Sequence, residues 1–266
     1  MRRTCRPPAV AGQFYPEDPN ELAALVQGLL AEAPRGRRYR AHSPKALIAP
    51  HAGLSYSGPI AASAYATLLA ERDTIDRIVL LGPSHRVALC GLAAPAREAF
   101  ETPLGEVPLD GAAIAHAADL PQVCIDDRPH ALEHSLEVQL PFLQLVLGRF
   151  ALVPFSVGDA SADEVAEVLK RLWGGPETRI VVSSDLSHYF DYATARRLDE
   201  QTTDAIERLD PAALGRASAC GRVPIRGLLV EALRRRLQVT TLDLRSSGDT
   251  AGARDQVVGY GAYAFD

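Results

Sequence analysis

The chain contains few cysteines, and none of them stands close to another. Its 266 residues include four, at Cys5, Cys90, Cys124 and Cys220. This spacing excludes the close cysteine pairs of a zinc ribbon and the cysteine framework of a small disulfide-rich domain. We expect all four to be thiols, as in proteins of a reducing cytosol.

Long apolar runs and a surplus of positive charge are also missing. No stretch approaches the roughly 18 apolar residues that span a bilayer. No apolar segment follows the basic start, residues 1–6, as it would in a secretory signal. The net charge of −5 argues against a nucleic-acid partner, because such proteins usually carry a basic surface. The sequence therefore predicts a soluble, cytoplasmic protein that binds neither membranes nor nucleic acid.

The composition that remains is that of an ordinary globular protein, with 47% hydrophobic and 23% charged residues. No repeat or low-complexity tract interrupts it, and the predicted linkers are short, so we expect one domain, residues 1–266. Apolar runs at 46–49, 78–81 and 180–182 are typical of strands buried on both faces. Further strands are predicted at 89–95, 152–157, 239–244 and 257–265, and helices at 19–33, 60–70, 111–118, 133–148, 161–173, 193–209 and 224–237. This alternation predicts a single α/β domain with a mixed, mostly parallel sheet covered by helices on both faces.

Three histidines follow three of these strands. His51 comes directly after Pro50, His85 follows a Gly-Pro-Ser turn, and His188 follows a Ser-Ser-Asp turn. One histidine in such a place is more often an ordinary loop or core residue. Three in the same setting favour a common site, because ligands of open α/β sheets bind beyond the carboxyl ends of the strands. Imidazoles gathered at one sheet edge suit a transition metal or proton transfer.

The other histidines carry weaker signals. His134 stands at the start of the predicted helix 133–148, where it either faces the site or takes part in capping the helix. His42, His116 and His130 are predicted to be exposed surface residues. Exposed segments are likewise predicted at 34–40, 100–105 and 246–256.

Several motifs resemble those of the Memo family, called in bacteria and archaea the AmmeMemoRadiSam system protein B. They are RPPAVAGQFYP from Arg6, APHAGLSYSG around His51, LGPSHR, EHSLEVQLPFL, VVSSDLSHY and CGRVPI from Cys220. The resemblance covers nearly the whole chain. It implies a fold similar to that of the class III extradiol dioxygenases, whose iron is held by two histidines and a glutamate.

The resemblance also implies a ligand set. His51, His85 and Cys220 match the residues that bind a metal in the family, and two imidazoles with a thiolate favour iron(II) or copper, with zinc as an alternative. Without the resemblance, Cys220 would be read as a small buried hydrophobic residue. His188 is expected to act as acid or base or to contact substrate, and His134 is a weaker candidate for the same pocket. Asp185 is expected to support the ligands or to add one, unless it caps a helix after the turn.

The function implied is that of a metal-dependent oxidoreductase or dioxygenase-like protein acting on an unknown small molecule. Two alternatives stay open: a non-catalytic metal- or peptide-binding adaptor, and a metal-dependent hydrolase. The family's bacterial name further implies a radical SAM protein and an AMMECR1-like protein as partners.

Overall fold

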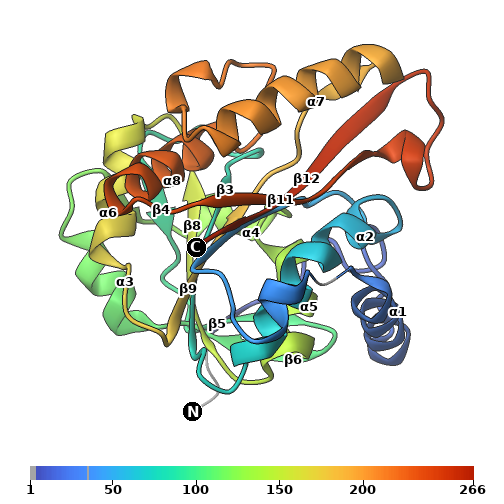
Figure 1. Ribbon diagram of the computed structural model, residues 1–266. Coiled ribbons are helices and arrows are strands. Elements are labelled where there is room, and N and C mark those ends of the chain that lie inside the picture. Colours follow the sequence, from blue (N-terminus) through green and yellow to red (C-terminus); the bar gives the residue numbers. More distant parts are fainter. Residues whose placement is uncertain (1–3, 35) are drawn as a thin grey trace.

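The centre of the fold is a nine-stranded sheet, seen in a computed structural model that describes residues 4–34 and 36–266 (Figure 1). Its strands lie in the order β10-β12-β2-β9-β3-β8-β4-β7, and β11 pairs with β12. The four central strands are parallel to one another, and nearly every residue in them is buried. They are β2 (Ala46–Ala49), β9 (Thr178–Ser183), β3 (Arg77–Pro83) and β8 (Ala151–Val157).

Antiparallel pairings extend the sheet on both sides of this core. On one side β12 pairs with β2, and it also pairs with β10 and β11; on the other side β4 pairs with β8, while β7 is parallel to β4. A separate three-stranded sheet has the order β1-β5-β6. The bounds of these strands are β10 His188–Phe190, β11 Val239–Ser246, β12 Val257–Phe265, β4 Leu92–Ala94, β7 Val123–Ile125, β1 Cys5–Arg6, β5 Ala99–Thr102 and β6 Gly105–Pro108.

Helices cover both faces of the large sheet, as predicted (Figure 1). Because successive side chains of a strand point to opposite faces, Leu47 belongs to the core on the side of α1, α2 and α5, while its neighbour Ile48 belongs to the core on the side of α3, α6, α7 and α8. This arrangement requires the continuous apolar runs seen in the sequence. The helices are α1 (Pro19–Glu32), α2 (Leu54–Tyr65), α3 (Gly111–Ala118), α4 (Arg128–Ala131), α5 (Leu140–Leu147), α6 (Ala162–Arg171), α7 (Tyr192–Glu207) and α8 (Arg222–Arg235).

Two predicted helices are wrong in their bounds. The helix expected at 60–70 begins at Leu54, and Pro59 lies inside it, so the turn read at Ser57-Gly58-Pro59 is helical. Gly58 allows close packing there, because a Cβ would lie 2.8 Å from Cδ1 of Leu29 on α1 and that flexible side chain would have to shift. After Tyr65 the chain continues as a 3₁₀ helix, Ala66–Glu71.

The helix expected at 133–148 is divided into three parts. It consists of an irregular stretch, a 3₁₀ turn at Glu137–Gln139, and α5 from Leu140. Pro141 fits the start of α5, since the first helical turn does not need its missing N–H. The predicted apolar stripe is still core: Leu136, Leu140 and Leu143 are buried.

Some predicted surface features are also different in the structure. His130 is buried, and its Nε2 lies 2.9 Å from the carbonyl oxygen of Ala93. Residues 100–105 belong to the β5–β6 hairpin, with Phe100 buried. The connector 34–40 contains a 3₁₀ turn at Arg37–Arg40, whereas Arg35 and residues 1–3 of the basic start lie outside the described residues. His42 and His116 are exposed as predicted. In the part of the chain that is described, no helix is both long and apolar enough to cross a membrane.

Candidate metal centre

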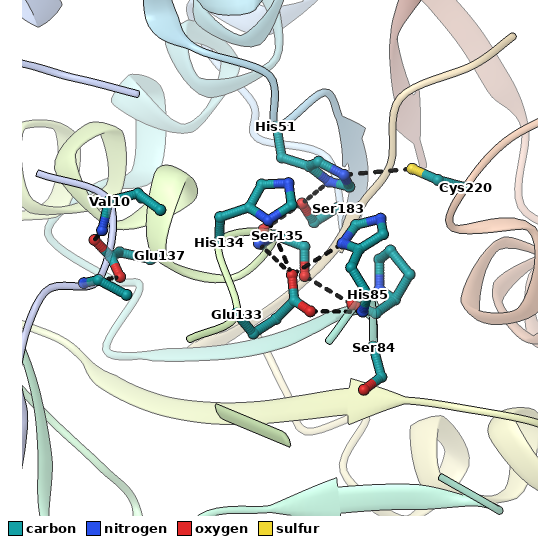
Figure 2. Close-up of polar contacts among 12 residues, drawn as sticks. Val10, His51, Ser84, His85, Glu133, His134, Ser135, Glu137, Ser183 and Cys220 are labelled. Atoms are coloured by element: carbon teal, nitrogen blue, oxygen red, sulfur yellow. Dashed lines mark hydrogen bonds and ion pairs between the residues drawn. The ribbon is translucent and has the colours of Figure 1, made fainter. Parts of the chain in front are cut away.

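Three histidines from distant parts of the sequence meet beyond the carboxyl ends of the central strands. His51 follows β2, His85 follows β3, and His134 lies in the irregular stretch before α5. One nitrogen from each ring can be chosen so that all three lie within 4.8 Å of one another. The ring centroids of His51 lie 5.3 Å from those of both other rings, and His85 and His134 are 4.8 Å apart (Figure 2).

The orientation of His51 is fixed by Ser183 at the end of β9. The Ser183 hydroxyl donates to the carbonyl oxygen of Ser135 at 2.6 Å and accepts from Nε2 of Gln139 at 2.7 Å. Its single proton is therefore used, so Nδ1 of His51, 2.8 Å away, must donate to it. This leaves the lone pair of His51 on Nε2, the form in which an imidazole binds a metal.

Glu133 fixes the orientation of His85. Its carboxylate accepts the backbone N–H of His85 at 2.6 Å and lies 2.9 Å from Nδ1 of that ring. Burial alone would raise the pKa of Glu133, but hydrogen bonds from His85 and from the backbone of Ser135 hold its pKa at about 2. A carboxylate acceptor places the proton of His85 on Nδ1, which leaves Nε2 free.

His134 lies farther from the Glu133 carboxylate than His85 does. Its Nδ1 lies 3.3 Å from Oε1 of Glu133 but is buried without a hydrogen-bond partner among the described residues. Burial lowers the pKa of His134 to about 4, and burial with neighbouring imidazoles lowers that of His51 well below its usual range. Both rings are thus neutral near pH 7. Three converging imidazoles with free nitrogens fit a transition metal.

Cys220 lies beside this group without belonging to it. Its Sγ is 3.3 Å from Nε2 of His51 and accepts the backbone N–H of Asp185 at 3.2 Å (Figure 2). Burial raises the pKa of Cys220 to about 12, so the side chain is a thiol in the metal-free protein. The cysteine lines a separate pocket of about 470 Å³ together with Ser84 and Arg222.

Asp185 and His188 take different places at the same edge. Asp185 is buried, and its carboxylate accepts the backbone N–H of His51 at 2.7 Å, so it fixes the turn after β2. Burial raises its pKa to about 6. It caps no helix, because the strand β10 begins at His188. Nδ1 of His188 lies 2.8 Å from the carbonyl oxygen of Leu186, which can only accept, so the lone pair is on Nε2.

A pocket of about 600 Å³ opens over these residues. His51, His85, His134, Asp185 and His188 all line it, so the three histidines that follow strands do share one opening. Part of its wall is aromatic, and residues of the predicted surface loop 246–256 form another part. The aromatic wall residues are Phe14, Tyr56, Tyr189 and Tyr260.

The comparison with known sequences agrees with the predicted resemblance. The sequence model of the family described as "Memo-like protein" matches residues 6–264. The chain belongs to the Memo family. MEMO1 family proteins of Methanopyrus kandleri and Aquifex aeolicus are each 36% identical to it, and that of Sulfolobus acidocaldarius is 34% identical. The alignments cover 96–98% of this chain and 97–99% of those relatives.

Two residues that orient the histidines of this Memo family protein were missed by the sequence analysis. The sequence places Glu133 at a helix start and Ser183 in the turn after the predicted strand 180–182, whereas Ser183 is the last residue of β9. A signal existed in both motifs, since EHSLEVQL and VVSSD place polar side chains where the neighbouring residues are apolar. Hydrogen-bonding groups in such places need buried partners.

Proposed function

We propose that this Memo family protein binds a transition metal through the imidazoles of His51, His85 and His134 and uses it to act on a small molecule. The observation that carries the proposal is the convergence of three imidazole nitrogens within 4.8 Å, with the protons of His51 and His85 held on Nδ1 by Ser183 and Glu133. Such fixed tautomers are the usual arrangement of histidines that bind metals.

Cys220 is the third ligand implied by the family resemblance, and it is retained as a further donor. Its sulfur and Nε2 of His51 are 3.3 Å apart, a separation suited to two ligands of one ion. Imidazoles with a thiolate favour iron(II), copper or zinc over magnesium or calcium. Bound iron or copper would supply redox chemistry, and for that reason we favour an oxidoreductase over a hydrolase.

His188 is the proposed acid–base residue. Its Nε2 carries the lone pair, and the ring lines the pocket without belonging to the three-histidine group. It is therefore placed to take a proton from a substrate held between the aromatic walls and to return it. Asp185 holds the backbone at His51 and so acts through that residue. The radical SAM and AMMECR1-like partners implied by the family name are part of the same proposal.

One feature favours the adaptor alternative. Tyr189 and Tyr56 on the rim of the pocket are 71% and 41% exposed, and exposed aromatic side chains are common where proteins bind peptides. The adaptor and the enzyme are separated by turnover, because both would bind metal.

The test is metal analysis of protein purified without oxygen. We expect bound iron or copper near one equivalent, lost in His51→Ala and His85→Ala and kept in His116→Ala, an exposed histidine on α3. The purified protein is then assayed for oxygen consumption with catechols and for turnover of ester and peptide panels. Equal metal content in all four proteins would contradict the proposed site.

A further inference from the structure

The N-terminal motif provides no ligand of the proposed metal site, although it lies against that site. Residues 6–15 run along the stretch that carries Glu133 and His134. Phe14 lines the pocket, and its ring centroid lies 4.7 Å from that of His134. The backbone carbonyl of Phe14 accepts the N–H of Leu54 at 2.8 Å, next to the turn that carries His51. One segment thus touches the chain on both sides of the histidine group.

Arg6 fastens this segment to the stretch that carries His134. Its guanidinium is buried and reaches three acceptors: the carbonyl oxygens of His130 at 2.9 Å and Glu133 at 2.7 Å, and the carboxylate of Glu137. His134 lies between Glu133 and Glu137, two of the residues to which Arg6 is bonded. A guanidinium suits this task because its donors are fixed in one plane and cannot all be replaced by one ammonium group.

Glu137 completes the attachment from the other side. Its fully buried carboxylate accepts the backbone N–H groups of Ala9 at 2.8 Å and Val10 at 3.0 Å, the hydroxyl of Tyr15, and Arg6 (Figure 2 shows Val10 and Glu137). The charge is therefore paired and fully hydrogen-bonded. The 3₁₀ turn that follows His134 is therefore attached to the N-terminal segment through Glu137.

We infer that the segment Arg6–Tyr15 is a positioning element of the metal centre, in which Arg6 sets the places of Glu133 and of the adjoining His134 by holding the backbone carbonyl oxygen of Glu133. The inference rests on the proposed metal site. Regular backbone hydrogen bonds around this stretch are few, from Glu133 N–H to His130 and from Val138 N–H to His134. Loss of Arg6 should therefore shift His134 and the carboxylate that orients His85. Arg6 touches none of the three imidazoles and acts only through the residues that do.

The chain offers a matched control in Arg179 on β9. Arg179 is also buried, and it also reaches two carbonyl oxygens, those of Pro176 and Thr178, and one carboxylate, that of Glu71. It lies near the opposite end of its strand from Ser183, away from the histidines. Arg6→Lys and Arg179→Lys therefore make the same chemical change at two buried guanidinium groups, although the partner Glu71 is partly exposed whereas Glu137 is fully buried.

The experiment titrates each purified variant with Co²⁺ and records its visible spectrum. We expect Arg6→Lys to bind Co²⁺ at least tenfold more weakly than the parent protein, with a changed spectrum, because loss of residues that support metal ligands costs about 10–100-fold in affinity. Arg179→Lys should stay within about twofold of the parent protein. Unchanged affinity and spectrum in Arg6→Lys, or an equal loss in both variants, would overturn the inference.

A metal-free measurement separates this inference from the proposed function. Imidazole ¹⁵N resonances of the metal-free protein should move for His134 and His85 in Arg6→Lys and stay in place in Arg179→Lys. If the parent protein fails to bind Co²⁺, the proposed function fails, and these resonances alone decide the role of Arg6. Should Arg6→Lys not fold, Phe14→Leu replaces it, because it removes the ring contact with His134 and keeps the buried ion pair. Unmoved His134 resonances in that variant would count against the inference.

Discussion

At the scale of single residues, the site is determined by a few hydrogen bonds that decide which imidazole nitrogens are free. The Ser183 hydroxyl has one proton and gives it to the carbonyl oxygen of Ser135, so His51 must donate to it. Glu133 is held ionised and accepts a hydrogen bond from Nδ1–H of His85. A metal ligand and an acid–base residue should therefore respond differently to removal.

His51→Ala should lose metal and with it all activity, because Nε2 of His51 lies at the centre of the proposed ligand set. His188→Ala should keep most of its metal and lose turnover by roughly 10²-fold or more, the usual effect of removing a general acid or base. Metal content and turnover are measured on the same preparations. A His188→Ala protein with full metal and unchanged turnover would leave the adaptor as the leading function.

Single cysteine-to-serine variants test the role of Cys220. If its sulfur binds the ion, Cys220→Ser should lower copper and iron content sharply, since a hydroxyl is a poor substitute for a thiolate toward these metals. Cys90→Ser and Cys124→Ser change exposed residues and should leave metal content as it is. Retention of all metal by Cys220→Ser would leave His134 as the third ligand.

At the scale of elements, the end of β3 is packed closely against the stretch that carries His134. A Cβ on Gly82 would lie 2.7 Å from Oγ of Ser135 and 3.0 Å from Cδ2 of Leu136. Both neighbours are buried, so neither can move without displacing the stretch between Glu133 and the 3₁₀ turn. The position of His134 thus depends on the absence of a side chain in β3.

Gly82→Ala should weaken metal binding by about tenfold or more and destabilise the protein by about 1–3 kcal/mol, the usual effect of overpacking. Gly28→Ala on α1 is the control, because a Cβ there meets nothing within 4 Å and alanine favours helix by up to about 1 kcal/mol. Urea unfolding and Co²⁺ titration measure the two effects. Equal Co²⁺ affinity in both variants would show that the close packing does not set the site.

The elements also show what the sequence could predict. The bounds of β2 were predicted because its apolar run is uniform and Pro50 ends it, and α3 because Asp110 precedes a run of alanines. The irregular stretch before α5 was not predicted, because its sequence pattern is typical of a helix. In the structure, Glu133 instead accepts the backbone N–H groups of Ser135 and of distant His85. His51, His85 and His188 could be placed because each follows a strand. The dioxygenase resemblance of the fold stays a prediction.

At the scale of the whole molecule, three histidines contribute to stability only while they are neutral. Burial lowers the pKa of His130 and of His134 to about 4 and lowers that of His51 well below its usual range. Asp185 and Asp199 oppose this effect, because burial raises the pKa of each to about 6 and the folded protein then binds their protons more readily. Between pH 4 and 6 the contributions of these histidines and aspartates to the free energy of unfolding therefore partly cancel. The contribution of one residue is obtained by comparing the parent protein with a variant at that position.

His130 allows that comparison because it lies outside the metal site. Its pKa is about 4 in the folded protein and about 6.5 when unfolded, so the unfolded chain binds the proton first as the pH falls. Its contribution to stability is complete above pH 6.5 and is lost progressively toward pH 4. A pKa difference of about 2.5 corresponds to roughly 3 kcal/mol.

His130→Gln keeps a donor toward Ala93 and has no such proton, so parent protein should lose roughly 3 kcal/mol relative to this variant between pH 7 and pH 4. Urea unfolding at several pH values measures the difference, with exposed His116→Gln as a control that should show almost none. A His130→Gln difference that does not vary with pH would mean that the pKa of His130 is the same in the folded and the unfolded protein.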